Sequence, residues 1–96
     1  MRRLEAYGNV LEGAKKWAGG RGVCRLLLGP NKVEAQREAE LVRITADACD
    51  LRFSDVEDPE STPENYRLMF LLNGTKAQMI EFASIMISLT ASPSAR

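Results

Sequence analysis

Residues 65–91, NYRLMFLLNGTKAQMIEFASIMISLTA, decide the fold because they join a strand pattern to a strongly apolar helix pattern. Every second residue from Tyr66 to Leu72 is apolar, which is typical of a strand with one buried face. Asn73-Gly74 predicts a turn, and Thr75 with Gln78 has the spacing of a capping box at a helix N-terminus. The helix that follows has only a narrow polar stripe, so we expect a sheet and a second chain to cover it.

The N-terminal part of the chain predicts a helix over residues 2–18. Apolar residues recur there at three- and four-residue spacing, and Gly19-Gly20 marks the end of the helix. A short strand over residues 3–7, followed by a helix capped by Asn9, is the alternative interpretation.

Three further elements are expected between residues 22 and 64. The apolar run Val23–Leu28 predicts a buried strand in which only Arg25 must reach water. Asn31 has the position of an N-cap for a helix that continues to about Ala48. Residues 51–54 alternate as a half-exposed strand, and residues 57–64, with four acids and two prolines, predict an exposed acidic loop.

These elements predict a single α+β domain over residues 1–96. An N-terminal helix (1–20) precedes a βαββα two-layer sandwich (22–91) that has a small mixed or antiparallel sheet and a long apolar C-terminal helix, and the tail 92–96 is expected to be frayed. A three-stranded sheet has open edges, so the pairing of two chains would extend the sheet and cover the last helix.

Composition narrows the possible functions. With no histidine, and with Cys24 and Cys49 far apart, the chain has few ligands for a metal, and we expect no cofactor and no enzymatic activity. No window of about 18 uncharged apolar residues and no signal-peptide pattern is present, so we expect an intracellular, cytoplasmic protein with no membrane partner.

Charge is unevenly distributed along the chain. Residues 1–32 hold seven basic and two acidic side chains, whereas residues 33–96 hold six basic and eleven acidic ones. Such asymmetry is typical of proteins with an anionic partner, of basic and acidic surfaces that meet within a dimer, or simply of solvated faces.

The segment KKWAGGRG, residues 15–22, is the main candidate for binding a ligand. Its basic side chains, tryptophan and glycines suit a phosphate backbone and a stacked base, so nucleic-acid (RNA) binding would fall on Lys15, Lys16, Trp17 and Arg21. Gly19-x-x-Gly22 resembles the GxxG loop of KH RNA-binding domains, although in that family the loop joins two helices and here it leads into a predicted strand. A helix stop followed by a flexible connection is the structural alternative.

The βαββα order of residues 22–91 resembles two known groups of proteins. It looks like the small dimer-forming subunits of the KEOPS tRNA-modifying complex, and like half of a ferredoxin-like or ACT regulatory domain. The first resemblance implies a subunit of a larger complex, and the second implies small-ligand binding at a dimer interface.

The sequence therefore predicts a non-catalytic interaction or regulatory module that works as a homodimer or as a subunit of a larger complex. The expected interface lies on the last helix and consists of Ile80, Phe82, Ile85, Met86 and Leu89. RNA binding through the basic segment and ACT-like ligand binding are the alternatives.

Overall fold

The computed structural model describes residues 3–91 and contains three helices and three strands. Along the chain these are α1 (Arg3–Lys15), β1 (Arg21–Leu28), α2 (Lys32–Ala48), β2 (Arg52–Glu57), β3 (Leu68–Thr75) and α3 (Lys76–Ala91). The predicted fold class, a helix followed by a βαββα sandwich, is confirmed. The predicted frayed tail lies outside the described residues.

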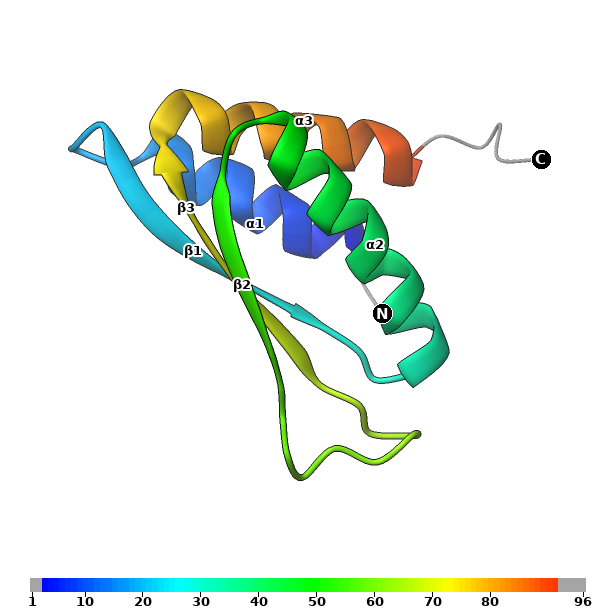
Figure 1. Cartoon of the computed structure of the whole chain (residues 1–96). Coiled ribbons are helices and arrows are strands. Elements are labelled where there is room, and N and C mark those ends of the chain that lie inside the picture. Colours follow the sequence, from blue (N-terminus) through cyan, green and yellow to red (C-terminus); the bar gives the residue numbers. More distant parts are fainter. Residues whose placement is uncertain (1–2, 92–96) are drawn as a thin grey trace.

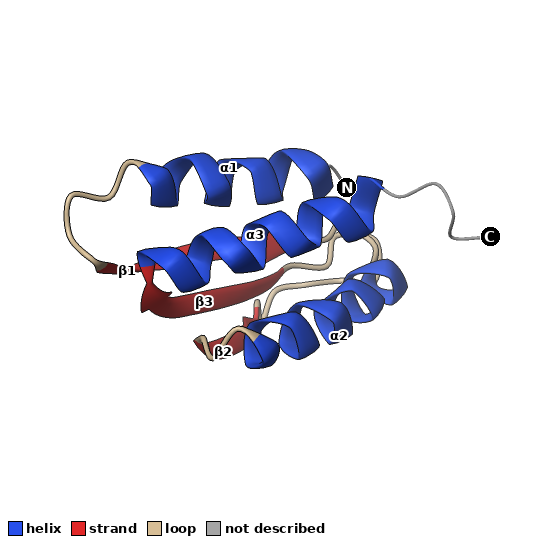
Figure 2. Ribbon diagram, turned by 90° about the horizontal axis from the view of Figure 1, so that it is seen from above, coloured by secondary structure: helices blue, strands red, loops and turns tan. Residues whose placement is uncertain are grey.

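The three strands form one antiparallel sheet in the order β1-β3-β2. Because β3 lies between β1 and β2, these two outer strands run parallel to each other and α2 connects them, which is a split βαβ arrangement. All three helices lie on one face of the sheet, with α3 between α1 and α2 (Figures 1 and 2). Within residues 3–91, no helix lies on the other face of the sheet.

The core lies between the sheet and the helix layer. Alternate residues of β3, from Leu68 to Leu72, point into it, as their spacing predicts. The largest fully buried side chains come from every helix and from β3; they are Tyr7, Val42, Phe70, Leu72, Met79, Phe82 and Met86.

The N-terminal segment is helical from Arg3, so the alternative with a strand over residues 3–7 is wrong. This helix packs along α3 on the β1 side, where the ring of Tyr7 meets the ring of Phe82 edge-on at 6.4 Å between centroids (Figure 2). From the sequence, we expected a second chain to bury part of the apolar surface of α3. Within this chain, α1 supplies much of the cover of that surface.

Both predicted helix caps are present. The Thr75 hydroxyl accepts a hydrogen bond from the Gln78 backbone N–H at 3.1 Å, and the Gln78 side chain accepts one from the Thr75 N–H at 2.9 Å. The Asn31 side chain accepts a bond from the Glu34 N–H at 3.0 Å at the start of α2. These bonds satisfy backbone donors that have no partner within the helix.

The expected turn at Asn73-Gly74 is wrong. Both residues remain in β3, where they pair with Val23 and Gly22 of β1, and α3 follows with no residue between strand and helix. Asn73 pairs with both β1 and β2 and Gly74 pairs with β1, and this pairing keeps the strand extended through the dipeptide.

The expectation that β1 is buried on both faces is also wrong. Its burial alternates, with Leu26 and Leu28 in the core and Val23 and Leu27 exposed, because helices cover only one face of the sheet. The strand is an outer strand with one solvated face, a feature typical of antiparallel sheets.

Candidate interaction surface

The helix-free face of the sheet, called here the open face, is built from the side chains that alternate with the core residues. The strand register aligns them in rows across β1, β3 and β2, which are Leu27–Met69–Val56, Arg25–Leu71–Ser54 and Val23–Asn73–Arg52. Arg21 pairs with Thr75 at the end of β1. The face therefore combines five apolar side chains with three arginines.

The apolar side chains of the open face form a connected patch. Val23, Leu27 and Val56 are 56%, 52% and 54% exposed, and Met69 and Leu71 lie half-buried between them on the central strand. Single exposed apolar residues are common on protein surfaces, but a contiguous group on one face is typical of a binding surface.

The two ends of the open face carry opposite charge. Arg21 and Arg52 lie where β1 and β2 begin, whereas the loop 58–67, which joins β2 to β3, lies at the other end (Figure 1). This loop carries three acids, Asp58, Glu60 and Glu64, and one base, Arg67, which lies 3.9 Å from the Asp58 carboxylate, so its net charge is negative. About six residues of strand, or roughly 20 Å, separate the two ends. Because this exceeds the Debye length of about 8 Å at physiological salt, the two ends do not neutralise each other within one chain.

The acidic loop is held by its own hydrogen bonds. The Asp58 backbone N–H donates to the Arg67 carbonyl oxygen at 2.9 Å, and the Ser61 hydroxyl accepts from the Arg67 N–H at 2.8 Å. The Asp58 carboxylate accepts a bond from the Glu60 N–H at 2.9 Å. Glu60 and Glu64 are exposed. The loop therefore holds these two acidic residues at the surface on a backbone that is fixed by hydrogen bonds.

The predicted nucleic-acid residues lie close together in the chain but face different directions. Lys15 ends α1, where its ammonium group lies 3.7 Å from the Glu12 carboxylate, and Lys16 is exposed in the following turn. The Trp17 ring packs on the helix side of the sheet against Gly22, whereas Arg21 lies on the open face. The structure therefore separates the tryptophan from the arginine it was expected to join.

None of the six aromatic side chains belongs to the open face. The aromatic residues of β2 and β3, Phe53 and Phe70, lie on the helix side with their ring centroids 6.3 Å apart. The open face therefore lacks the aromatic platform on which proteins usually stack unpaired bases.

The expected interface on α3 is only partly accessible. Phe82 and Met86 are fully buried in the core of the single chain, and Ile80 is half-buried. Ile85 and Leu89 remain exposed, at 36% and 50%. Two of the five predicted residues cannot contact a partner while this fold is intact, because α1 and the sheet already cover them.

A buried polar cluster joins α1 to α2. The Glu38 carboxylate is buried and accepts a hydrogen bond from the Tyr7 hydroxyl, and the Arg3 guanidinium lies 2.7 Å from its other oxygen. Burial, followed by the bond to Glu38, raises the pKa of Tyr7. Both oxygens of this carboxylate therefore have partners, and the tyrosine is held in its neutral form.

A cleft of about 280 Å³ lies beside this cluster, lined by Arg3, Glu34, Arg37, Glu38 and Leu41. Its size is at the lower limit of about 300 Å³ for small-molecule pockets. ACT-like regulation by a ligand stays a prediction, which a ligand-induced rise in melting temperature would test.

The cysteines do not form a reactive site. Both are free, and burial raises the pKa of the Cys24 and Cys49 thiols, which favours the unreactive protonated form. Among residues 3–91 no group of three or more metal-binding side chains comes together, and no helix in that range is long and apolar enough to cross a membrane.

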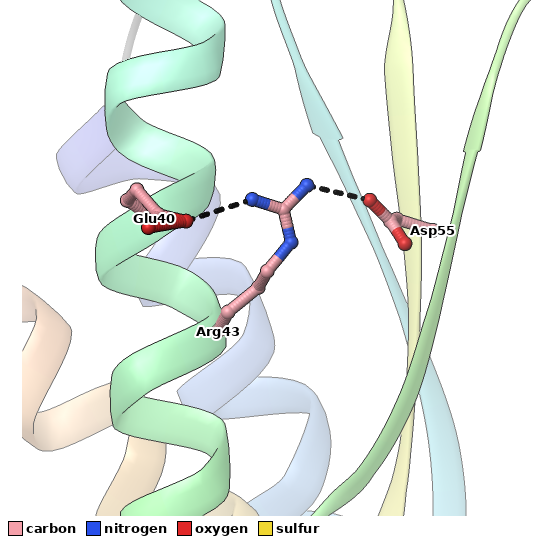
Figure 3. Close-up of polar contacts among 3 residues, drawn as sticks. All are labelled: Glu40, Arg43 and Asp55. Atoms are coloured by element: carbon pink, nitrogen blue, oxygen red, sulfur yellow. Dashed lines mark hydrogen bonds and ion pairs between the residues drawn. The ribbon is translucent and has the colours of Figure 1, made fainter.

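The two outer edges of the sheet differ. At the β2 edge, the Arg43 guanidinium of α2 lies 2.7 Å from Asp55 of β2 and 3.0 Å from Glu40 (Figure 3). At the β1 edge, a groove of about 280 Å³ runs between α1 and β1, lined by Ala6, Asn9, Val10 and residues 24–27. The β2 edge is thus tied to its helix by an ion-pair network, and the β1 edge faces a groove.

No protein family, curated protein or solved structure matches the chain.

Proposed function

We propose that the protein is a non-catalytic association module that pairs with a second copy of itself through the open face of its sheet. The observation that carries this proposal is the connected apolar patch of that face, with basic and acidic charge at its opposite ends. Apolar burial would supply the free energy of association, and the charges would set its orientation.

The size of the face favours an interface that includes the charged ends. Three strands of up to eight residues, spaced about 4.8 Å apart with a rise of about 3.4 Å per residue, cover roughly 400 Å². A stable interface buries about 800 Å² on each partner. A stable dimer must therefore also bury the acidic loop and the basic end.

Charge selects one of two twofold arrangements for stacked sheets. If the axis runs along the strands, Arg21 and Arg52 of one copy meet the same residues of the other, and like charges repel. If the axis lies in the interface and crosses the strands, each basic end meets the partner's loop 58–67, with Glu60 and Glu64. We infer the second arrangement, which makes the same favourable contact twice.

Light scattering during size-exclusion chromatography tests this proposal. A dimer is expected at micromolar concentration, and it should dissociate more readily at high salt because the charged ends are exposed. Met69→Glu would place a charge in the middle of the patch and should give a monomer. The matched control Ile44→Glu changes an exposed apolar residue of α2 and should stay dimeric. A wild-type monomer, or a dimeric Met69→Glu variant, would contradict the proposal.

Nucleic-acid binding is the second candidate function, supported by the group of basic side chains at one end of the sheet. Lys15, Lys16, Arg21 and Arg52 are all exposed there. Fluorescence anisotropy with a labelled single-stranded RNA at low salt is the test, because phosphate contacts weaken as salt rises. Lys15→Ala with Lys16→Ala should weaken binding, whereas Arg37→Ala on α2 should not. Equal binding by both variants would dismiss this candidate.

A further inference from the structure

The outer edge of β1 is long and regular enough for a further strand to pair with it. Its eight residues contain no proline, and their register with β3 runs without a bulge from Arg21 to Leu28. The other outer strand, β2, has six residues and carries Asp55 and Glu57 on its helix side. Short length, inward charges and charged side chains along the strand are among the means by which natural sheets protect an edge. The first two occur only in β2, whereas the charges of β1, Arg21 and Arg25, lie on the open-face side of the strand.

The helix layer extends beyond the sheet on the β1 side. Packed helices lie about 8–10 Å apart, whereas paired strands lie about 4.8 Å apart, so three helices are wider than three strands. Because α1 lies on the β1 side of α3, it overhangs the free edge (Figure 2). The groove lined by Ala6, Asn9 and Val10 above and by residues 24–27 beside it is the space below this overhang.

A second copy of the chain does not fit at this edge. Antiparallel pairing of two β1 strands would place the twofold axis only about 2.4 Å outside each strand, which is half the strand spacing. The two overhanging α1 helices would then occupy the same space, because packed helices need about 8–10 Å between their axes. A single extended segment needs only one strand spacing and avoids this collision.

The neighbouring side chains define the segment that would bind. On the helix side, Ala6 and Asn9 leave room for small apolar side chains. On the open-face side of β1, Arg21 and Arg25 alternate with Val23 and Leu27, and the two arginines would lie beside acidic residues of an added strand. We propose that the β1 edge binds an extended peptide segment with alternating small apolar and acidic residues, as a fourth strand of the sheet. This proposal does not depend on self-association through the open face.

Fluorescence anisotropy with a labelled eight-residue peptide of alternating Val and Glu tests this inference. The peptide should bind. In a paired strand the N–H groups of alternate residues face β1, and N-methylation of those residues should weaken binding at least tenfold, because it removes the hydrogen-bond donors that pair with β1. Two peptides, one methylated on each alternate set of residues, identify the set that faces β1. Equal binding by both methylated peptides and the parent would overturn the proposal, since charge alone would then explain the affinity.

Protein variants provide the second arm. Asn9→Trp fills the groove and should weaken binding at least tenfold, whereas Gln36→Trp, on an exposed position of α2, should leave it unchanged. Met69→Glu, designed to be monomeric, should still bind the peptide, which separates this proposal from the proposed dimer. No detectable binding to the wild-type chain, unchanged binding by Asn9→Trp, or displacement of the peptide by single-stranded RNA would overturn it.

Discussion

The indole ring of Trp17 lies against the backbone of Gly22, so closely that a Cβ atom on this glycine would be 2.8 Å from two ring carbons. The loop between them is held to the start of α3, where the Lys76 backbone N–H donates to the Gly20 carbonyl oxygen at 2.8 Å. The basic segment is thus part of the packing that joins α1, β1 and α3.

Gly22→Ala should destabilise the chain by about 1–3 kcal/mol, because the added methyl group forces the ring of Trp17 to move. Gly8→Ala is the matched control. Nothing lies within 4 Å of the corresponding Cβ in α1, so this change should stabilise the helix by about 0.5–1 kcal/mol. Urea denaturation measures both changes, and equal effects of the two substitutions would contradict the packing described for Trp17.

Tyr7→Phe should destabilise the fold at neutral pH by about 1–3 kcal/mol, because it removes the hydrogen bond to the buried Glu38 carboxylate. Urea denaturation of wild type and variant measures this difference. A variant as stable as the wild type would contradict the role of the bond.

The same tyrosine predicts a dependence of stability on pH. Its pKa is raised in the folded chain above the ordinary value of 10.0, so the unfolded chain loses this proton first as the pH rises. This contribution to stability is complete below pH 10 and falls above it. The decline should be shallower in Tyr7→Phe than in the wild type. Parallel stability curves for the two proteins above pH 10 would contradict the assignment.

Thr75→Ala should cost about 1 kcal/mol, because it removes the side-chain acceptor of the capping box at the start of α3. Ser84→Ala, on the exposed face of the same helix, is the control and should change stability by less than about 0.5 kcal/mol. Thermal denaturation compares them. If both variants melt like the wild type, the cap contributes little to the stability of α3.

The sequence was sufficient to predict the elements and their layers. Alternation in residues 66–72 and capping at Asn31 and Thr75 are local signals, and the structure confirms the order of elements that they predict. The stop expected at Gly19-Gly20 is only approximate, because α1 already ends at Lys15. The turn expected at Asn73-Gly74 failed because pairing with two neighbouring strands overrides a local preference.

The candidate surface could not be predicted, because it depends on how the elements pack. The apolar run Val23–Leu28 looks like a strand buried on both faces, and only the one-sided helix layer shows that Val23 and Leu27 are exposed. Likewise, Phe82 and Met86 belong to an apolar helix whose cover by α1 comes from a distant segment. The local signs of an exposed face were Arg25 within the apolar run of β1 and the alternation of residues 51–54.

Light scattering on charge-reversed variants, alone and mixed, tests association through the open face most directly. One variant carries Arg21→Glu and Arg52→Glu at the basic end of the open face, and the other carries Glu60→Lys and Glu64→Lys in the acidic loop. A control variant carries Glu12→Lys and Glu81→Lys. These changes lie at exposed helix positions and give the control the same net charge as the loop variant.

We predict that the open-face and loop variants are each monomeric at concentrations where the wild type is a dimer. Mixed together they should form a heterodimer, because each basic surface then meets an acidic one. The helix control keeps the open face and the acidic loop, so it should dimerise with itself, and in a mixture the open-face variant should remain monomeric beside the control dimer. Wild-type dimerisation in either variant alone, or a heterodimer of the open-face variant with the helix control, would contradict association through the open face.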